Sequence, residues 1–69
     1  MQELYNLSKN LIELRKQYGY TQQYVASYLG ITYQSYQAYE RGITVPTLQN
    51  FIKLSKLYEI SCDELLSIN

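Results

Sequence analysis

The sequence contains no histidine and no tryptophan, and only one cysteine and one proline. Without histidine it lacks the side chain that most often activates a nucleophile or ligates a metal. Cys62 has neither a histidine to activate it nor a second cysteine with which to form a disulfide bond inside the chain. We therefore expect no catalysis and no bound metal or cofactor.

Net charge is also absent, because six basic residues balance six acidic ones. The acidic residues are scattered and suggest no catalytic pair: Glu3, Glu13, Glu40, Glu59, Asp63 and Glu64. Residues 14–58 hold five of the cations against Glu40, whereas residues 59–69 hold three acids and no cation. One end of the chain is basic and the other acidic, so zero net charge does not exclude a nucleic-acid partner.

No apolar run approaches the ~18 residues of a membrane span, and residues 1–13 lack the basic start and apolar stretch of a secretion signal. With 46% hydrophobic and 17% charged residues, the 69-residue chain has the composition of one small folded domain, residues 1–69. We expect a cytoplasmic protein without a membrane partner.

Periodic apolar residues and helix-ending glycines predict the first two helices. One helix face carries an apolar stripe that ends before Gly19: Leu4, Leu7, Leu11, Leu14 and Tyr18. Thr21 suits the N-cap of a short second helix that buries Val25, Ala26 and Leu29 and stops at Gly30.

Three further caps predict three further helices, giving five helices and no strands. Thr32 begins the third helix, which places Tyr36 and Tyr39 in the core and ends at Gly42. Thr47 begins the fourth after the irregular residues 43–46, and its inward residues are expected to be Leu48, Phe51, Ile52 and Leu54. Ser61 to Glu64 has the Ser-x-x-Glu form of a capping box and opens the last helix.

Two short helices joined by a glycine turn form a helix-turn-helix, whose second helix enters the major groove of DNA. The stretches LIELRKQYGYTQQYVASYLGIT, YQAYERG, PTLQNFIKLSKLYEIS and DELL resemble the phage-repressor and Cro-type (Xre) DNA-binding domains over nearly the whole chain. This resemblance implies a compact all-α, five-helix bundle of the lambda-repressor-like type, with helices 2 and 3 as the helix-turn-helix.

The resemblance also implies which residues contact DNA. Tyr33, Gln34 and Gln37 would face the bases, and glutamine is suited to this because it pairs bidentately with adenine. Contacts to the DNA backbone would come from the starts of helices 2 and 3 and from the end of helix 3 and the loop after it: Thr21, Gln22, Thr32, Ser35, Arg41 and Thr44. Tyr33 could instead pack on a sugar or thymine methyl, donate to phosphate or lie on the surface. Lys53, Lys56 and Arg41 either bind the DNA backbone or are merely solvated.

Some matched positions have structural implications. Arg15 and Glu40 would form a partly buried ion pair between helices 1 and 3, and Glu59 replaces a common glycine and would adopt a left-handed conformation. Cys62 would be a small apolar residue, buried or at an interface, rather than a redox sensor.

The function that the sequence predicts is a bacterial or phage transcriptional regulator, most simply a repressor. One recognition helix reads few base pairs, so we expect a homodimer on an inverted-repeat operator, joined through the last helix: Cys62, Leu65, Leu66 and Ile68. Controller protein, antitoxin and mobile-element regulator stay open, as do any effector and a place at the start of a longer protein. The rival function is a protein–protein adaptor with weak or no DNA binding.

Overall fold

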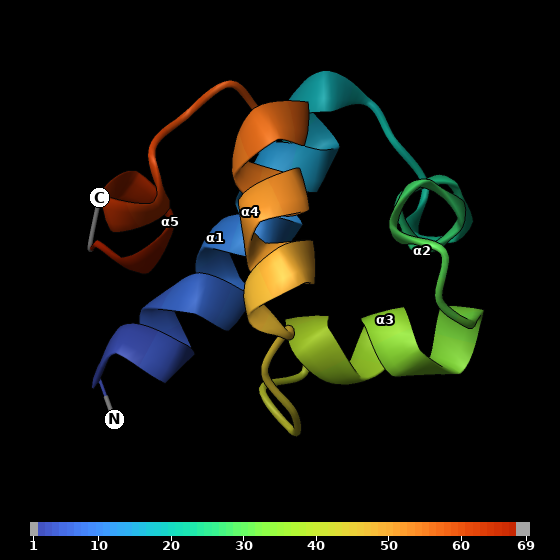
Figure 1. Cartoon of the computed structure of the whole chain (residues 1–69), viewed down its shortest axis with the longest axis horizontal. Coiled ribbons are helices and arrows are strands. Elements are labelled where there is room, and N and C mark those ends of the chain that lie inside the picture. Colours follow the sequence, from blue (N-terminus) through green and yellow to red (C-terminus); the bar gives the residue numbers. More distant parts are fainter. Residues whose placement is uncertain (1, 68–69) are drawn as a thin grey trace.

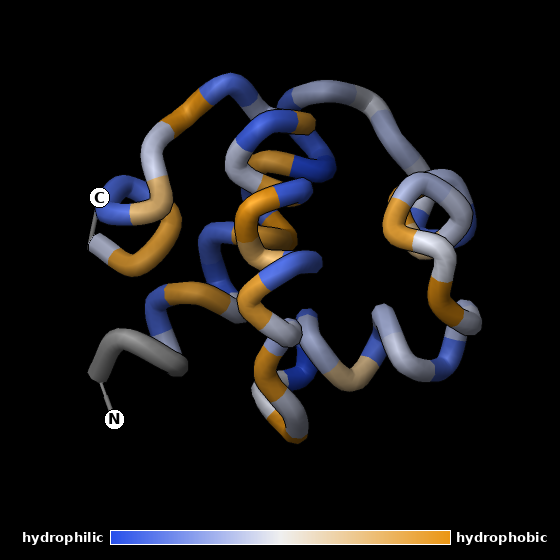
Figure 2. Tube along the Cα trace, viewed as in Figure 1, coloured by the Kyte–Doolittle hydropathy of each residue, from blue (hydrophilic) through white to orange (hydrophobic). Residues whose placement is uncertain are grey.

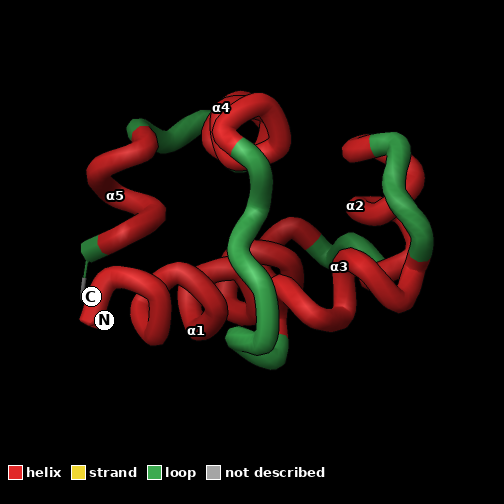
Figure 3. Tube along the Cα trace, turned by 60° about the horizontal axis from the view of Figure 1, so that its bottom comes forward, coloured by secondary structure: helices red, strands yellow, loops and turns green. Residues whose placement is uncertain are grey.

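Five α-helices make up the described part of the chain, which is residues 2–67 of a computed structural model, with side chains described from residue 5. They are α1 (Gln2–Tyr18), α2 (Gln22–Leu29), α3 (Tyr33–Glu40), α4 (Leu48–Leu57) and α5 (Cys62–Leu66). Residues 2–67 contain no strand, and loops alone connect the helices (Figure 3). None of the described helices has the length and apolar character needed to cross a membrane.

A hydroxyl side chain caps the start of each helix after α1, as the sequence predicted. The side-chain oxygen accepts a hydrogen bond from the backbone N–H three residues further on in every case: Thr21, Thr32, Thr47 and Ser61. At α5 the Glu64 carboxylate also accepts from the Ser61 backbone N–H at 2.9 Å, which completes the capping box. Local chemistry therefore sets where these helices begin.

Left-handed residues shape the connections between helices, and two of them are informative. Gly30 ends α2 with φ 73°, and because nothing lies within 4 Å of an added Cβ there, its backbone angle rather than crowding requires glycine. Glu59 adopts φ 56° after α4, which confirms the expectation for this position. A side chain in this conformation costs about 1–2 kcal/mol, so the packing around the α4–α5 connection must offset the strain.

Helices α2 and α3 pack against each other and contact the rest of the bundle through α1 and α4. The long helix α1 packs against α3 and α5, and α4 packs against α2 and α5 (Figure 1). Two buried asparagines of α1 tie α5 in place: Asn10 donates to the carbonyls of Leu65 and Ser67 at 2.9 and 2.8 Å, and Asn6 donates to that of Leu66 at 3.2 Å. These bonds satisfy carbonyl groups at the end of a very short helix.

The core is built from aliphatic residues and three tyrosines. Its buried hydrophobic members are Leu7, Leu11, Val25, Ala26, Leu29, Tyr36, Tyr39, Leu54, Tyr58 and Leu65. The expected inward positions of α2 and the core positions of α3 are therefore confirmed. On α1 the buried stripe holds for Leu7 and Leu11 and weakens at half-buried Leu14; Tyr18 lies largely outside it, and the side chain of Leu4 is not among those described.

For α4, the expectation that Leu48 and Ile52 face inward is wrong. Leu48 is 75% exposed and Ile52 is 40% exposed, whereas Leu54 is fully buried. The buried face is centred on Asn50, Leu54 and Tyr58, which recur every four residues, and Asn50 donates to the Tyr39 hydroxyl at 3.2 Å. Leu48 and Ile52 lie on the other side of the helix, so their apolar character serves a surface rather than the core.

On α5, Leu65 was expected at a dimer interface, and the structure corrects this. Leu65 is 0% exposed within the single chain and belongs to the core. It is the residue through which the short helix anchors to the rest of the bundle, and it is not available to a partner. Leu66 is half-buried, and Ile68 lies outside the described residues.

Two buried tyrosines give a matched test of the core. The Tyr36 hydroxyl donates to Glu40, whereas the buried Tyr58 hydroxyl has no hydrogen-bond partner among the described residues. Tyr58→Phe should leave the free energy of unfolding unchanged or raise it, because it removes an unsatisfied polar group. Tyr36→Phe should lower it by about 1–3 kcal/mol. Urea unfolding measures both, and equal losses would contradict this account of the core.

Candidate nucleic-acid interface

The helix-turn-helix is formed by α2 and α3, two helices of eight residues each. Between them, the Ile31 N–H donates to the Ala26 carbonyl at 3.0 Å, and the left-handed Gly30 turns the chain sharply. The inner faces of both helices are buried in the core. The first turn of α3, formed by Tyr33, Gln34 and Ser35, is exposed.

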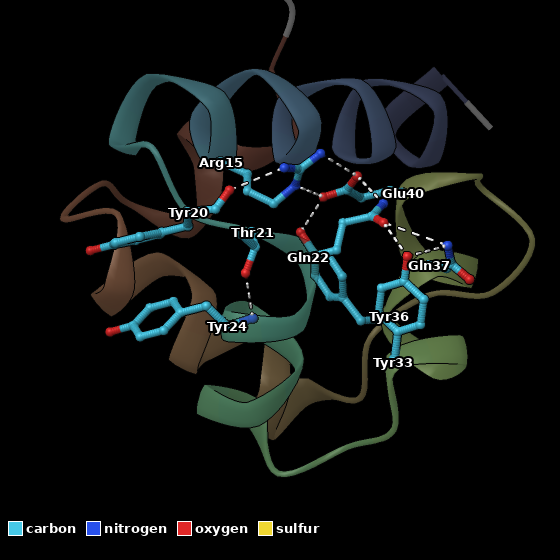
Figure 4. A network of polar contacts seen from close by, with 9 residues as sticks. All are labelled: Arg15, Tyr20, Thr21, Gln22, Tyr24, Tyr33, Tyr36, Gln37 and Glu40. Atoms are coloured by element: carbon cyan, nitrogen blue, oxygen red, sulfur yellow. Dashed lines mark hydrogen bonds and ion pairs between the residues drawn. The ribbon is translucent and has the colours of Figure 1, made fainter.

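The carboxylate of Glu40 joins three helices from its position at the end of α3. Its Oε2 accepts from Arg15 Nε of α1 at 2.7 Å and from the Tyr36 hydroxyl at 2.5 Å. Its Oε1 accepts from Arg15 Nη2 at 3.2 Å and from Gln22 Nε2 of α2 at 2.9 Å (Figure 4). The ion pair that the resemblance implied is thus present, and the carboxylate has four donors around its two oxygens.

Burial and hydrogen bonding act in opposite directions on this pair. The Glu40 side chain is 4% exposed and that of Arg15 16%. Burial by itself raises the pKa of the Glu40 carboxyl, but the hydrogen bonds from Arg15, Tyr36 and Gln22 outweigh burial and hold the pKa below its ordinary value. The hydrogen bond to Glu40 raises the pKa of Arg15. Both groups therefore stay charged around neutral pH.

A second layer of hydrogen bonds connects this centre to the surface of α3. The Tyr33 hydroxyl donates to Gln22 Oε1 at 3.2 Å, and Gln37 Nε2 donates to the Tyr33 hydroxyl at 3.0 Å (Figure 4). The structure thus brings together two of the three expected base-contacting residues with the expected phosphate ligand Gln22. Gln34, the third, is exposed and has no side-chain hydrogen bond within the described residues.

Sequence reasoning missed this network. The spacing of Tyr33 and Gln37, and of Tyr36 and Glu40, is four residues, which places each pair on one helix face and was a usable signal. The contact from Gln22 to Glu40 crosses from α2 to α3, and no local spacing reports it. The half-buried Gln22 therefore orients α3 side chains, a role that its expected phosphate contact did not include.

The remaining residues expected at the DNA backbone are exposed: Thr21, Thr32, Ser35, Arg41 and Thr44. Thr32 Oγ1 donates to Ser35 Oγ at 2.9 Å at the start of α3, while Thr21 and Arg41 lie at the start of α2 and the end of α3. The resulting surface offers hydroxyls, helix N-termini and one guanidinium, all of which can bind phosphate.

Negative charge is kept away from this surface. Glu40 is the only acidic residue between Thr21 and Gly42, and it is buried against Arg15. The half-buried Lys53 and exposed Lys56 lie in the part of α4 that runs away from α3 (Figure 1). The surface of the helix-turn-helix therefore carries no unpaired carboxylate, although the whole chain is neutral.

A separate apolar groove lies between the start of α4, the loop before it, α1 and α5. Its volume is about 230 Å³, and its lining residues are Leu7, Val45, Pro46, Leu48, Phe51 and Leu66. The loop that projects after α3 carries apolar positions (Figure 2), and Val45 and Leu48 are exposed. Of the residues expected at the dimer interface, Leu66 lines this groove and half-buried Cys62 does not.

The Glu40 ion pair has a predictable effect on stability and its pH dependence. Because the folded-state pKa of Glu40 lies below its unfolded value, its stabilisation is fully present above the unfolded pKa, ~4.3, and is lost as the pH falls through the lower folded pKa. Glu40→Gln should lower the free energy of unfolding by more than the ~1 kcal/mol limit of an exposed pair, and should flatten its acid dependence.

Thermal and urea unfolding from pH 7 to pH 3 measure both effects. Glu13→Gln, at an exposed position on α1, is the matched control and should change little. If the two variants behave alike, the Glu40 pair contributes nothing beyond surface electrostatics.

Comparison with known proteins identifies relatives of this arrangement. The helix-turn-helix family model HTH_3 matches residues 11–65. The chain is 43% identical over 56 residues to the HTH-type transcriptional regulator AnsR of Bacillus subtilis, a match that covers 81% of this chain and 48% of AnsR. It is 39% identical over 59 residues to the cryptic phage CTXphi transcriptional repressor RstR of Vibrio cholerae, covering 86% of this chain and 53% of RstR.

A solved structure has a similar fold. The crystal structure of a transcriptional regulator from Listeria innocua matches with a TM-score of 0.85 and 26% identity, over 91% of this chain and 60% of that one. The chain spans about half the length of the curated relatives it matches.

Proposed function

Because the chain belongs to the helix-turn-helix family HTH_3, we propose that it is a transcriptional regulator that binds specific double-stranded DNA with α3 in the major groove. The observation that carries this proposal is the exposed polar first turn of α3, presented on a helix-turn-helix whose only carboxylate is buried and paired. Its similarity to proteins named as regulators and as a phage repressor supports the same role.

The contacts in this proposal divide into two sets. Tyr33, Gln34 and Gln37 face the base edges. The backbone set holds the phosphates through hydroxyls, helix N-termini and Arg41, so that few cations are needed: Thr21, Gln22, Thr32, Ser35, Arg41 and Thr44. Binding would repress transcription by occupying an operator and blocking polymerase in the cytoplasm, without a catalytic step.

An adaptor function is the second candidate, favoured by an aromatic surface. Tyr18, Tyr20 and Tyr24 form a row with ring centroids 5.6 and 4.7 Å apart, and Tyr18 and Tyr24 are exposed. Exposed tyrosines are common at protein interfaces. Selection from a random DNA library separates the two functions, because an adaptor that has lost DNA binding enriches no sequence.

Gln34 gives the direct test of base reading. Gln34→Ala should cost about 1–3 kcal/mol of binding free energy on the selected site and much less on unrelated DNA, because a base contact contributes only where the right base is present. Gel-shift titrations on both DNAs measure this difference. Gln17→Ala, which removes an exposed glutamine outside the helix-turn-helix, should change neither affinity. Equal losses on both DNAs for Gln34→Ala would assign Gln34 to the phosphate contacts instead.

A second copy of the chain is part of the proposal. One eight-residue recognition helix covers too few base pairs for useful specificity in a genome, whereas a two-fold dimer reads two half-sites about 34 Å apart. The molecule is 26 × 23 × 20 Å, so two copies side by side can span that distance. The operator should then be an inverted repeat.

The apolar groove is the surface that suits this second copy. Leu48 is both one of its lining residues and the most exposed large hydrophobic residue described, so the same surface offers a protrusion and a hollow, as a two-fold interface requires. Residues 43–52 include no charged residue, so like charges would not face each other across the two-fold axis. The groove also adjoins the loop after α3, which leaves the first turn of α3 clear for DNA.

Leu48→Asp tests this interface. The substitution places a negative charge in the first turn of α4, where the helix dipole favours it, so folding should be preserved. Sedimentation at tens of micromolar should show a dimer for the native chain and a monomer for Leu48→Asp. Tyr24→Asp, an equally drastic change on exposed α2, should remain a dimer. A native monomer, or a dimer that survives Leu48→Asp, would place the interface elsewhere or remove it.

A further inference from the structure

The hydrogen bonds between Glu40 and the surface of α3 have a fixed direction. Glu40 is ionised and can only accept, so the side-chain nitrogen of Gln22 must face it, as it does at 2.9 Å. The carbonyl oxygen of Gln22 is consequently turned toward Tyr33 and Gln37 of α3 (Figure 4). A buried charge thus sets the orientation of a half-buried amide.

The same logic fixes the next two groups. A tyrosine hydroxyl has one hydrogen, and that of Tyr33 is donated to Gln22 Oε1 at 3.2 Å. The Tyr33 oxygen can then only accept, so Gln37 must present its amide nitrogen, which lies 3.0 Å from it. Gln37 Nε2 also lies 3.5 Å from Gln22 Oε1. The Gln37 carbonyl oxygen therefore points away from the network, as Figure 4 shows.

We propose that the ordered hydrogen bonds among Gln22, Tyr33 and Gln37 turn the Gln37 carbonyl oxygen toward the DNA. Gln37 then selects a base with an amino group in the major groove, adenine first and cytosine second. The proposal rests on the proposed entry of α3 into the major groove. In it Gln37 touches the base, while Tyr33 and Gln22 are positioning residues that hold the Gln37 amide in one of its two orientations.

The chemistry of the base edges gives the order of preference. Adenine offers an N6 amino donor beside the N7 acceptor, so it can bind the Gln37 carbonyl and also accept from the second hydrogen of the amide. Cytosine offers the N4 amino donor alone. Guanine and thymine place carbonyl oxygens on the groove edge, which would oppose the Gln37 oxygen.

Reversing the Gln37 amide is unfavourable while the hydrogen bonds that link Gln22, Tyr33 and Gln37 are intact. The reversed amide would set its oxygen about 3 Å from the Tyr33 oxygen, whose only hydrogen is already donated to Gln22. Gln34 differs, because no hydrogen bond to another described residue orients its side chain, and it can turn either edge to the DNA. The two glutamines of α3 should therefore differ in how strictly they discriminate. Tyr33, with its hydroxyl already committed, offers DNA only its ring.

Selection of bound sequences from a random DNA library tests the proposal. The position read by Gln37 is identified as the one whose preference disappears in Gln37→Ala. There the native chain should favour adenine over guanine by about 5- to 150-fold, the range expected for one good base contact. Gln37→Glu retains an acceptor but no donor and should shift the preference to cytosine.

Tyr33→Phe is the decisive variant, because it keeps the ring and removes the hydroxyl. Because only the 3.5 Å contact to Gln22 Oε1 then holds the Gln37 amide, the adenine-to-guanine ratio at that one position should fall, while the preference at the Gln34 position and the melting temperature are retained. Tyr24→Phe, at an exposed tyrosine on α2, is the matched control and should leave both ratios unchanged.

The outcomes separate this proposal from the proposed function. If sequences are enriched but guanine or thymine is preferred at the Gln37 position, or Tyr33→Phe leaves the ratio unchanged, the ordered hydrogen bonds do not set specificity and only this proposal fails. A selection in which Gln37→Ala alters no position also overturns it. If the native chain enriches no sequence at all, both proposals fail.

Discussion

The arrangement of the helix-turn-helix depends on one buried carboxylate. Glu40 accepts hydrogen bonds from Arg15 of α1, Gln22 of α2 and Tyr36 of α3, so a single charge is shared by three helices. A buried anion is tolerated only while its donors stay in place, because an uncompensated charge is very costly. The relative position of α1, α2 and α3 is therefore tied to a set of hydrogen bonds, each of which has a required direction and length.

An apolar contact in the same place could hold the helices together equally well, since buried ion pairs are often no more stabilising than hydrophobic residues of similar volume. An apolar contact, however, has no donor-to-acceptor direction and therefore cannot orient a neighbouring polar group. α2 and α3 are each eight residues long, too short to be stable alone, and they depend on tertiary contacts for both stability and orientation. The hydrogen bonds to Glu40 fix the orientation of α2 and α3. Through Gln22 and Tyr33 they also fix the orientation of the Gln37 amide.

The sequence was most informative where structure is local and least where it depends on distant partners. Thr21, Thr32, Thr47 and Ser61 mark the helix starts because capping involves only three residues. Leu48, Ile52 and Leu65 were misassigned because apolar spacing does not tell which flank of a short helix meets the core: that depends on neighbours such as Asn50, Tyr39 and Asn10, which are far apart in the chain. For the candidate site, family resemblance pointed to the Arg15–Glu40 pair. The direction of the hydrogen bonds around that pair could be known only from the three-dimensional structure.

The zero net charge of the chain is the strongest objection to a nucleic-acid partner. The positions of the charged residues weaken that objection. The exposed part of the helix-turn-helix has Arg41 and no exposed acid, because its one carboxylate is buried and balanced by Arg15. A surface of this kind gains little from nonspecific counterion release, so more of its affinity has to come from oriented hydrogen bonds to bases and phosphates. Oriented bonds discriminate only if the protein fixes which atom faces the groove. In the proposed recognition, the buried charge at Glu40 therefore matters more than the net charge of the chain, because it determines which end of the Gln37 amide faces the DNA.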